Sequence, residues 1–107
     1  MIARIWHGWT HPDNADAYER VVSTEVLPAI AARKIPGYRG ANLMRRELVG
    51  EVEFVTVMWF DSLDNVRDFM GDDYEVSHVP PEAQVVLSRF DTRSQHYDVL
   101  LTPDVTA

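Results

Sequence analysis

The sequence predicts an α+β domain in which two helices cover one face of an antiparallel sheet, and two observations lead to that prediction. Segments typical of strands and helices follow one another in the order strand, helix, strand, strand, helix, strand. Two strand–helix–strand halves joined by a hairpin give a ferredoxin-like βαββαβ sheet with both helices on one side. The third strand, residues 52–60, hardly alternates between apolar and polar side chains, so both of its faces should be buried.

The first half of the chain supplies one strand and one interrupted helix. Residues 2–10 are rich in Ile and Trp, which favour extended backbone, and Pro12 then ends the strand. Residues 15–26 place apolar side chains on one helical face, opposite charged ones. Pro28 interrupts this pattern, so we expect residues 27–34 to form a second short helix set at an angle to the first.

The second half supplies three more strands and one helix. A strand over residues 38–48 leads through a short glycine-bearing loop into the unalternated strand, and we expect Leu48 to pair with Val52 across that hairpin. Residues 63–70 carry apolar side chains at helical spacing, and Gly71 follows them as a stop signal. Residues 90–101 should form the last strand.

Composition bounds the class of protein. The 107 residues fit one domain, expected over 1–107. A net charge of −7 makes nucleic acid an unlikely partner, because phosphate binding requires clustered cations. There is no cysteine, hence no disulfide and no thiolate chemistry. Neither a membrane-spanning run nor a signal peptide is visible, so we expect a cytoplasmic location and no membrane partner.

The sheet face that the helices leave bare is expected to be apolar, because the third strand is apolar on both sides. A large exposed apolar surface marks an interface. A second copy of the same sheet is the simplest way to cover it, since most soluble oligomers are symmetric dimers. The sequence therefore predicts a homodimer.

Five stretches resemble the antibiotic biosynthesis monooxygenase superfamily of dimeric α+β barrels. These stretches are residues 1–8, 36–40, 43–46, 59–63 and 96–100. The resemblance implies a cofactor-independent monooxygenase that oxidises a small aromatic compound, such as a phenol, anthrone or quinol, with O2. Such a substrate is deprotonated to an electron-rich anion that reacts with O2 itself. The protein then has to supply a dry cavity between sheet and helices, a base, and donors that hold the anion.

The resemblance also suggests site residues. His7, near the end of the first strand, is the candidate base, since imidazole titrates near neutral pH. His78 is a candidate acid/base partner, or an iron ligand if the protein binds haem. For either histidine the alternative is a structural or surface role.

The substrate would be bound by residues similar in type to those of the oxygenase members, or walled by an aromatic ring. These candidates are Trp9, Asn65, Phe69, Tyr74 and Arg89. Phe69 replaces a Trp of those members and lacks its N–H donor. Packing is the alternative for the aromatic residues. Trp6 should face away from Trp9, because strand side chains alternate.

Other functions remain as alternatives. No metal site is expected, because the acidic residues around the second helix have no histidine at ligand spacing and are typical of a solvated face. Haem binding and degradation is one rival activity, for which His78 is the argument. The other is a non-catalytic dimer that binds a small ligand on the same scaffold.

Overall fold

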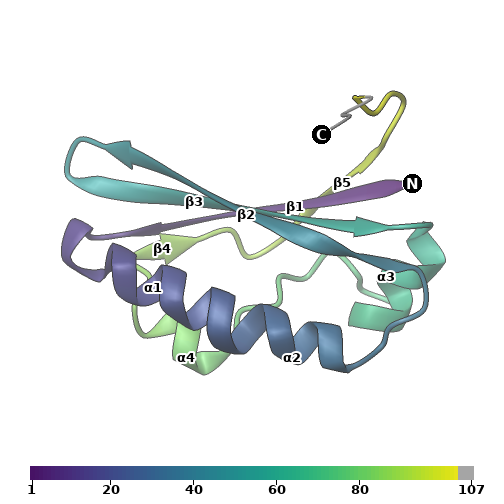
Figure 1. Ribbon diagram of the computed structural model, residues 1–107, viewed down its shortest axis with the longest axis horizontal. Coiled ribbons are helices and arrows are strands. Elements are labelled where there is room, and N and C mark those ends of the chain that lie inside the picture. Colours follow the sequence, from purple (N-terminus) through teal and green to yellow (C-terminus); the bar gives the residue numbers. More distant parts are fainter. Residues whose placement is uncertain (104–107) are drawn as a thin grey trace.

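An antiparallel sheet lies over a layer of helices in the computed structural model (Figure 1), which describes residues 1–103. The last four residues of the predicted domain therefore lie outside the described residues. The strands are β1 (Ile2–Thr10), β2 (Tyr38–Leu48), β3 (Glu51–Phe60), β4 (Arg89–Phe90) and β5 (Gln95–Asp98). The helices are α1 (Ala15–Val21), α2 (Leu27–Ala32), α3 (Leu63–Met70) and α4 (Pro81–Gln84), besides a 3-10 turn, Pro12–Asn14. The strand order is β2-β3-β1-β4, and β5 also pairs with β1. The predicted ferredoxin-like α+β fold is confirmed.

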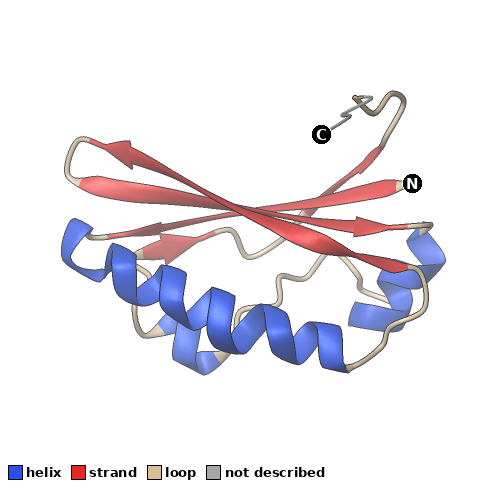
Figure 2. Cartoon of the chain, viewed as in Figure 1, coloured by secondary structure: helices blue, strands red, loops and turns tan. Residues whose placement is uncertain are grey.

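The first helical region runs on as one rod instead of turning at Pro28 (Figure 2). A π-helical turn, Val22–Val26, connects α1 to α2 without a break. Pro28 then falls in the first turn of α2, where a residue without an N–H is tolerated. The predicted change of direction is wrong because the wider π turn absorbs the interruption of the hydrogen-bond pattern.

The β2–β3 hairpin has a tighter turn than predicted. Leu48 pairs with Glu51, which leaves Val49 and Gly50 as a two-residue turn. Gly50 has a positive φ of 78°, a backbone conformation that glycine adopts without strain. The predicted pairing of Leu48 with Val52 is therefore wrong by one residue.

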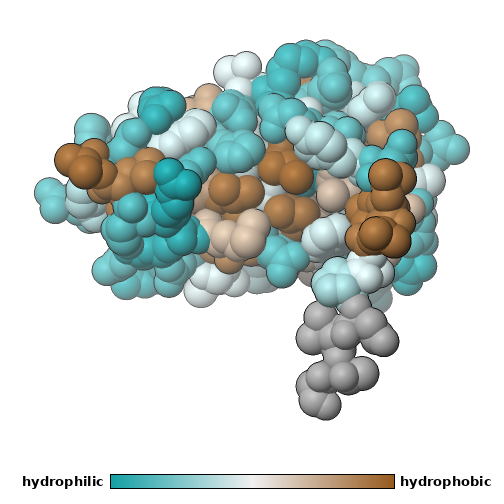
Figure 3. Space-filling model, turned by 90° about the horizontal axis from the view of Figure 1, so that it is seen from above, coloured by the Kyte–Doolittle hydropathy of each residue, from teal (hydrophilic) through white to brown (hydrophobic). Residues whose placement is uncertain are grey.

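The two faces of the sheet have different neighbours. Even-numbered residues of β1 and β3 face the helices and form the core, with Phe54 and Phe60 fully buried. Odd-numbered residues lie on the other side, which we call the bare face. On the bare face, Val57 pairs with Ile5 and its exposed fraction is 8%. Met44 of β2 pairs with Val55 on the same face, and its exposed fraction is 49%. Figure 3, seen from above the sheet, shows hydrophobic residues gathered in the middle of this side.

The last strand is split in two rather than continuous over residues 90–101. Between β4 and β5 the chain leaves β1 and bonds to the segment 74–77 instead. The Ser77 N–H donates to the Thr92 carbonyl at 3.0 Å, and the Ser94 N–H donates to the Glu75 carbonyl at 2.6 Å. The predicted single strand is wrong because this second set of backbone partners competes with β1. The detour brings Ser94 and the segment 74–77 beneath β1, where the pocket lies.

Within residues 1–103, no helix is long and apolar enough to cross a membrane.

Two glycines with similar backbone angles allow a matched test of packing at the turn before β2. Gly37 has φ +74° and Gly50 has φ +78°. A methyl group at 37 would overlap the Asn65 side chain, whereas nothing lies within 4 Å of one at 50. We expect Gly50→Ala to lower the free energy of unfolding by about 1 kcal/mol through backbone strain alone. Gly37→Ala should lose at least about 1 kcal/mol more.

The measurement is the urea midpoint of each variant at unchanged slope. Equal losses for the two variants would show that Asn65 moves aside freely and that the contact does not hold the turn.

Candidate functional site

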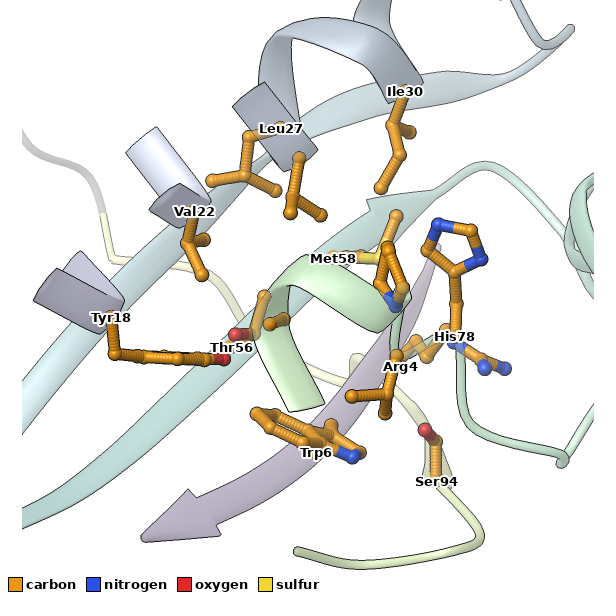
Figure 4. Close-up of a pocket in the computed structure, with 14 residues that line it drawn as sticks. Arg4, Trp6, Tyr18, Val22, Leu27, Ile30, Thr56, Met58, His78 and Ser94 are labelled. Atoms are coloured by element: carbon orange, nitrogen blue, oxygen red, sulfur yellow. The ribbon is translucent and has the colours of Figure 1, made fainter. Parts of the chain in front are cut away.

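A pocket opens between the helix-facing side of the sheet, the α1–α2 rod and the segment that leads into α4 (Figure 4). Its cavity volume is about 50 Å³. A water molecule needs about 10–15 Å³ in this measure, so the cavity holds a few waters. Its walls are mostly apolar and come from Trp6, Val22, Val26, Leu27, Ile30 and Met58, together with Val79, Pro80 and Ala83. Its polar groups are Arg4, Tyr18, Thr56, His78 and Ser94.

The aromatic wall, formed by Trp6 and Tyr18, is held by contacts with α1 and with the chain after β4. The Trp6 and Tyr18 rings stack with centroids 6.4 Å apart. The Trp6 indole N–H donates to the Asp91 carbonyl at 2.9 Å, which ties the wall to the chain between β4 and β5. Gly8 is required beside it, because a methyl group there would overlap the Trp6 ring. Burial raises the pKa of Tyr18, so its hydroxyl stays protonated and can donate.

Arg4 is the unusual member of the lining, because it is a charged residue only 3% exposed. Its guanidinium donates to the carbonyls of Tyr74 and Val76, the second at 2.8 Å, and to His96 Nε2 at 2.9 Å. Burial lowers its pKa to about 10, against the opposing charge of Glu75. Arg4 is therefore still a cation at neutral pH.

His96 on β5 completes this network. Because a guanidinium has donors only, His96 Nε2 must accept, which places the imidazole proton on Nδ1. Burial, followed by the charge of Arg4, lowers the pKa of His96 to about 4, so this ring is neutral. Its Nδ1 is buried and has no hydrogen-bond partner among residues 1–103.

His78 lies at the mouth of the pocket, on the same side as Arg4 (Figure 4). The residue is exposed to solvent, while its ring packs edge-on against Phe69 at 5.3 Å. Partial burial lowers the pKa of His78 below its ordinary value of 6.5, and the positive charges of Arg33 and Arg4 lower it further. The imidazole is therefore neutral at neutral pH and can accept a proton.

Three of the residues predicted from the sequence lie on the bare face, away from the pocket. His7 Nδ1 is 3.2 Å from Asp91 Oδ2, and its ring stacks on Trp9. The Arg89 guanidinium lies 3.9 Å from the centroid of a Trp9 ring and pairs with Glu51 at 2.7 Å. His7 thus has its own partners and does not line this pocket. Trp6 and Trp9 do face opposite sides, as the alternation predicted.

Two of the other predicted residues, Phe69 and Tyr74, contact Arg4, and one does not. Phe69 is 4% exposed, and the guanidinium carbons of Arg4 and Arg33 lie 5.6 and 5.0 Å from its ring centre. Tyr74 contributes its carbonyl to Arg4, and its ring meets His96 edge-on. Asn65 is the exception, since it contacts Gly37 and accepts a hydrogen bond from Ser62 at 2.9 Å.

These groups gather around Arg4, which is not among the site residues predicted from the sequence. Arg4 lies between Ile2 and Trp6 at every second position of β1, so it shares their buried face. A charged residue in phase with buried neighbours is the signal that would have identified it. Tyr18 belongs to the apolar face predicted for residues 15–26, a pattern that by itself does not distinguish packing from pocket lining.

The side chains of the site do not provide what a metal ion or haem requires. Within residues 1–103, no three His, Cys, Asp or Glu side chains gather to hold a metal ion. His78 is the one imidazole in the pocket lining and could ligate iron. A cavity of about 50 Å³ beneath Val79 and Ala83 does not admit a porphyrin, so the residues present do not fit haem in this conformation.

Comparison with known proteins finds similarity in structure only. The sequence matches no family profile and no curated protein. A Bacillus cereus protein, provisionally described as an antibiotic biosynthesis monooxygenase, superposes with a TM-score of 0.66 at 10% identity and 97% coverage of each chain. Rv0793 from Mycobacterium tuberculosis gives 0.60 at 16% identity, covering 94% of this chain and 96% of its own.

A third similar structure is MhuD from Mycobacterium tuberculosis, a haem degrader with two haems bound in its active site. It gives a TM-score of 0.59 at 18% identity and covers 96% of this chain and 99% of its own. Identities this low establish the fold and leave the activity open. The resemblance drawn from the sequence is thereby confirmed at the level of the fold: the chain has the fold of the antibiotic biosynthesis monooxygenase-like proteins.

Proposed function

We propose that the protein is a monooxygenase that oxidises a small ionisable aromatic compound, a phenol, anthrone or quinol, with O2 and without a cofactor. The observation that carries the proposal is a neutral imidazole, His78, at the mouth of an apolar pocket beside the buried cation Arg4. A base of this kind can take the substrate hydroxyl proton, and the neighbouring positive charge favours the anion that forms.

The chemistry then needs little more from the protein. The substrate O–H gives its proton to a ring nitrogen of His78, which is exposed and can pass it to solvent. The electron-rich anion transfers electrons to O2 and forms a carbon–oxygen bond as a peroxide on the ring carbon. Loss of water leaves one oxygen atom as a new carbonyl, so a phenol plus O2 gives a quinone plus H2O. The apolar walls keep bulk water away from these species.

One observation favours the second candidate, a non-catalytic protein that binds a small ligand. The cavity is small, and the segment carrying His78, Val79 and Pro80 forms part of its wall. Oxidation of a substrate larger than one ring would require this segment to move. Binding of a small aromatic compound with no O2 consumption would support the second candidate.

We also infer that two copies cover each other's bare face. Apolar side chains occupy the centre of that face, with hydrophilic residues around them (Figure 3). The pocket lies on the opposite side of the sheet, so the dimer would stiffen the sheet without blocking the pocket mouth.

The role of His78 is tested by His78→Gln. Loss of a general base should lower kcat by about 10²-fold or more, measured as O2 consumption with a panel of phenols and quinols. The matched control is His11→Gln, at an exposed position just after β1, which should leave the rate unchanged.

The same assay with His7→Gln decides between the two histidines. Loss of turnover in His7→Gln together with full activity in His78→Gln would contradict this proposal and return the base to the bare face.

The pH dependence of kcat/KM follows from the direction of the His78 shift. The base works when neutral, so activity is present above its pKa and is lost as the pH falls through that value, which lies below 6.5. Arg33→Gln removes one of the charges that lower this pKa, so the acid limb of the profile should move to higher pH. Arg20→Gln, on the exposed side of α1, is the control. If the acid limb of the kcat/KM profile does not move in Arg33→Gln, His78 is not the base whose titration it reports.

The dimer is tested by sedimentation at micromolar concentration. We expect the unaltered protein to be a dimer and Met44→Asp to be a folded monomer, because the substitution places a charge in the apolar interface. Val85→Asp introduces the same charge beside α4, where Val85 is 82% exposed, and should leave the dimer intact. A monomeric parent protein would refute the inference.

A further inference from the structure

We infer that the pocket selects a small, single-ring aromatic anion and holds its negatively charged oxygen against the guanidinium of Arg4. This inference rests on the proposed function, because it concerns the same pocket, but it names the substrate class and the residue that recognises it.

The first argument is the charge of Arg4. The chain has more acidic than basic residues, and its surface arginines form ion pairs with the acids. Arg45 pairs with Asp16, Glu19 and Glu47, and Arg39 pairs with Asp61. Arg4 is the most buried of these cations, yet within residues 1–103 no carboxylate forms an ion pair with it.

The acid whose charge acts on Arg4, Glu75, already forms an ion pair with another arginine. Glu75 acts on Arg4 only through its charge, while its carboxylate lies 3.2 Å from Arg93. A buried cation without a counter-ion is costly, and an anionic ligand in the pocket would offset that cost.

The second argument is the orientation of the guanidinium. An arginine has five N–H donors, and Arg4 uses three of them, on Tyr74, Val76 and His96. These three contacts fix the plane of the group. The remaining two N–H groups have no acceptor among residues 1–103, and Arg4 lines the pocket. Free N–H donors on a guanidinium that is already fixed in place can stabilise a developing or existing oxyanion without reorganisation.

The third argument is size and shape. A cavity of about 50 Å³ leaves no room for a fused three-ring compound unless α4 moves away. The flat walls of Trp6 and Tyr18 suit one aromatic ring, with the aliphatic side chains of Val22 and Leu27 around it. Among the compounds named above, this favours a single-ring phenol or quinol over an anthrone. A carboxylate on a single ring would fit in the same way.

The test compares benzoate with benzamide, which have nearly the same shape but differ in charge. Calorimetric titration of the unaltered protein should show benzoate binding at about millimolar affinity or tighter, and at least about tenfold more tightly than benzamide. Arg4→Gln should abolish this preference, and Arg4→Lys should keep part of it. Arg39→Gln, which removes an exposed arginine far from the pocket lining, should leave it unchanged.

A phenol whose ionisation is visible in its spectrum gives a second readout. Bound para-nitrophenol should ionise at lower pH than free para-nitrophenol in the unaltered protein, and this difference should disappear in Arg4→Gln. If Arg4→Gln does not fold, the comparison of benzoate with benzamide and the spectrum of bound para-nitrophenol in the unaltered protein decide the matter.

Equal affinity for benzoate and benzamide, or binding of neither at about millimolar concentration, would overturn the inference. Neither measurement needs turnover, so the two proposals fail separately. Anion-selective binding without O2 consumption would retain the recognition by Arg4 and reject the monooxygenase. Oxidation of phenols without tighter binding of the anion would retain the monooxygenase and reject the recognition by Arg4.

Discussion

The buried guanidinium of Arg4 is the interaction on which the rest of the site depends. It joins three parts of the chain that are distant in sequence: β1 through its own backbone, the segment 74–76 through two carbonyls, and β5 through His96. Hydrogen bonds to a charged group contribute about 1.5–3 kcal/mol each, more than neutral ones, so the network holds an otherwise irregular segment under the sheet. That segment leads directly to His78 and α4, which form the mouth of the pocket.

This network also explains the electrostatics of the site. The protein as a whole is acidic, but Arg4 and Arg33 flank Phe69 and make the end of the pocket positive. Burial, followed by the same two charges, lowers the pKa of His78, so that its imidazole is neutral and can accept a proton.

The similar structures share the scaffold and not a common chemistry. A protein provisionally described as a monooxygenase and a haem degrader both superpose on nearly the whole of this chain, at identities of 10% and 18%. The sheet and its helices therefore leave the choice of reaction to a few side chains that project into the pocket. In this chain those side chains are Arg4, Tyr18, Thr56, His78 and Ser94, a set that favours a small anion over a porphyrin.

The sequence by itself determined the order of the elements, the fold class and the extent of β1 and β2, because those depend on local periodicity and turn residues. It also placed Trp6 and Trp9 on opposite faces. Periodicity could not say which face of β1 the helices cover, so it could not show that the pocket would be lined by Arg4 and not by His7. The hairpin register, the split of the last strand and the position of His78 beside Arg4 were decided by the tertiary structure alone. The last two depend on hydrogen bonds between segments far apart in the chain, for which no local pattern exists. The register depends instead on a two-residue turn at Val49 and Gly50.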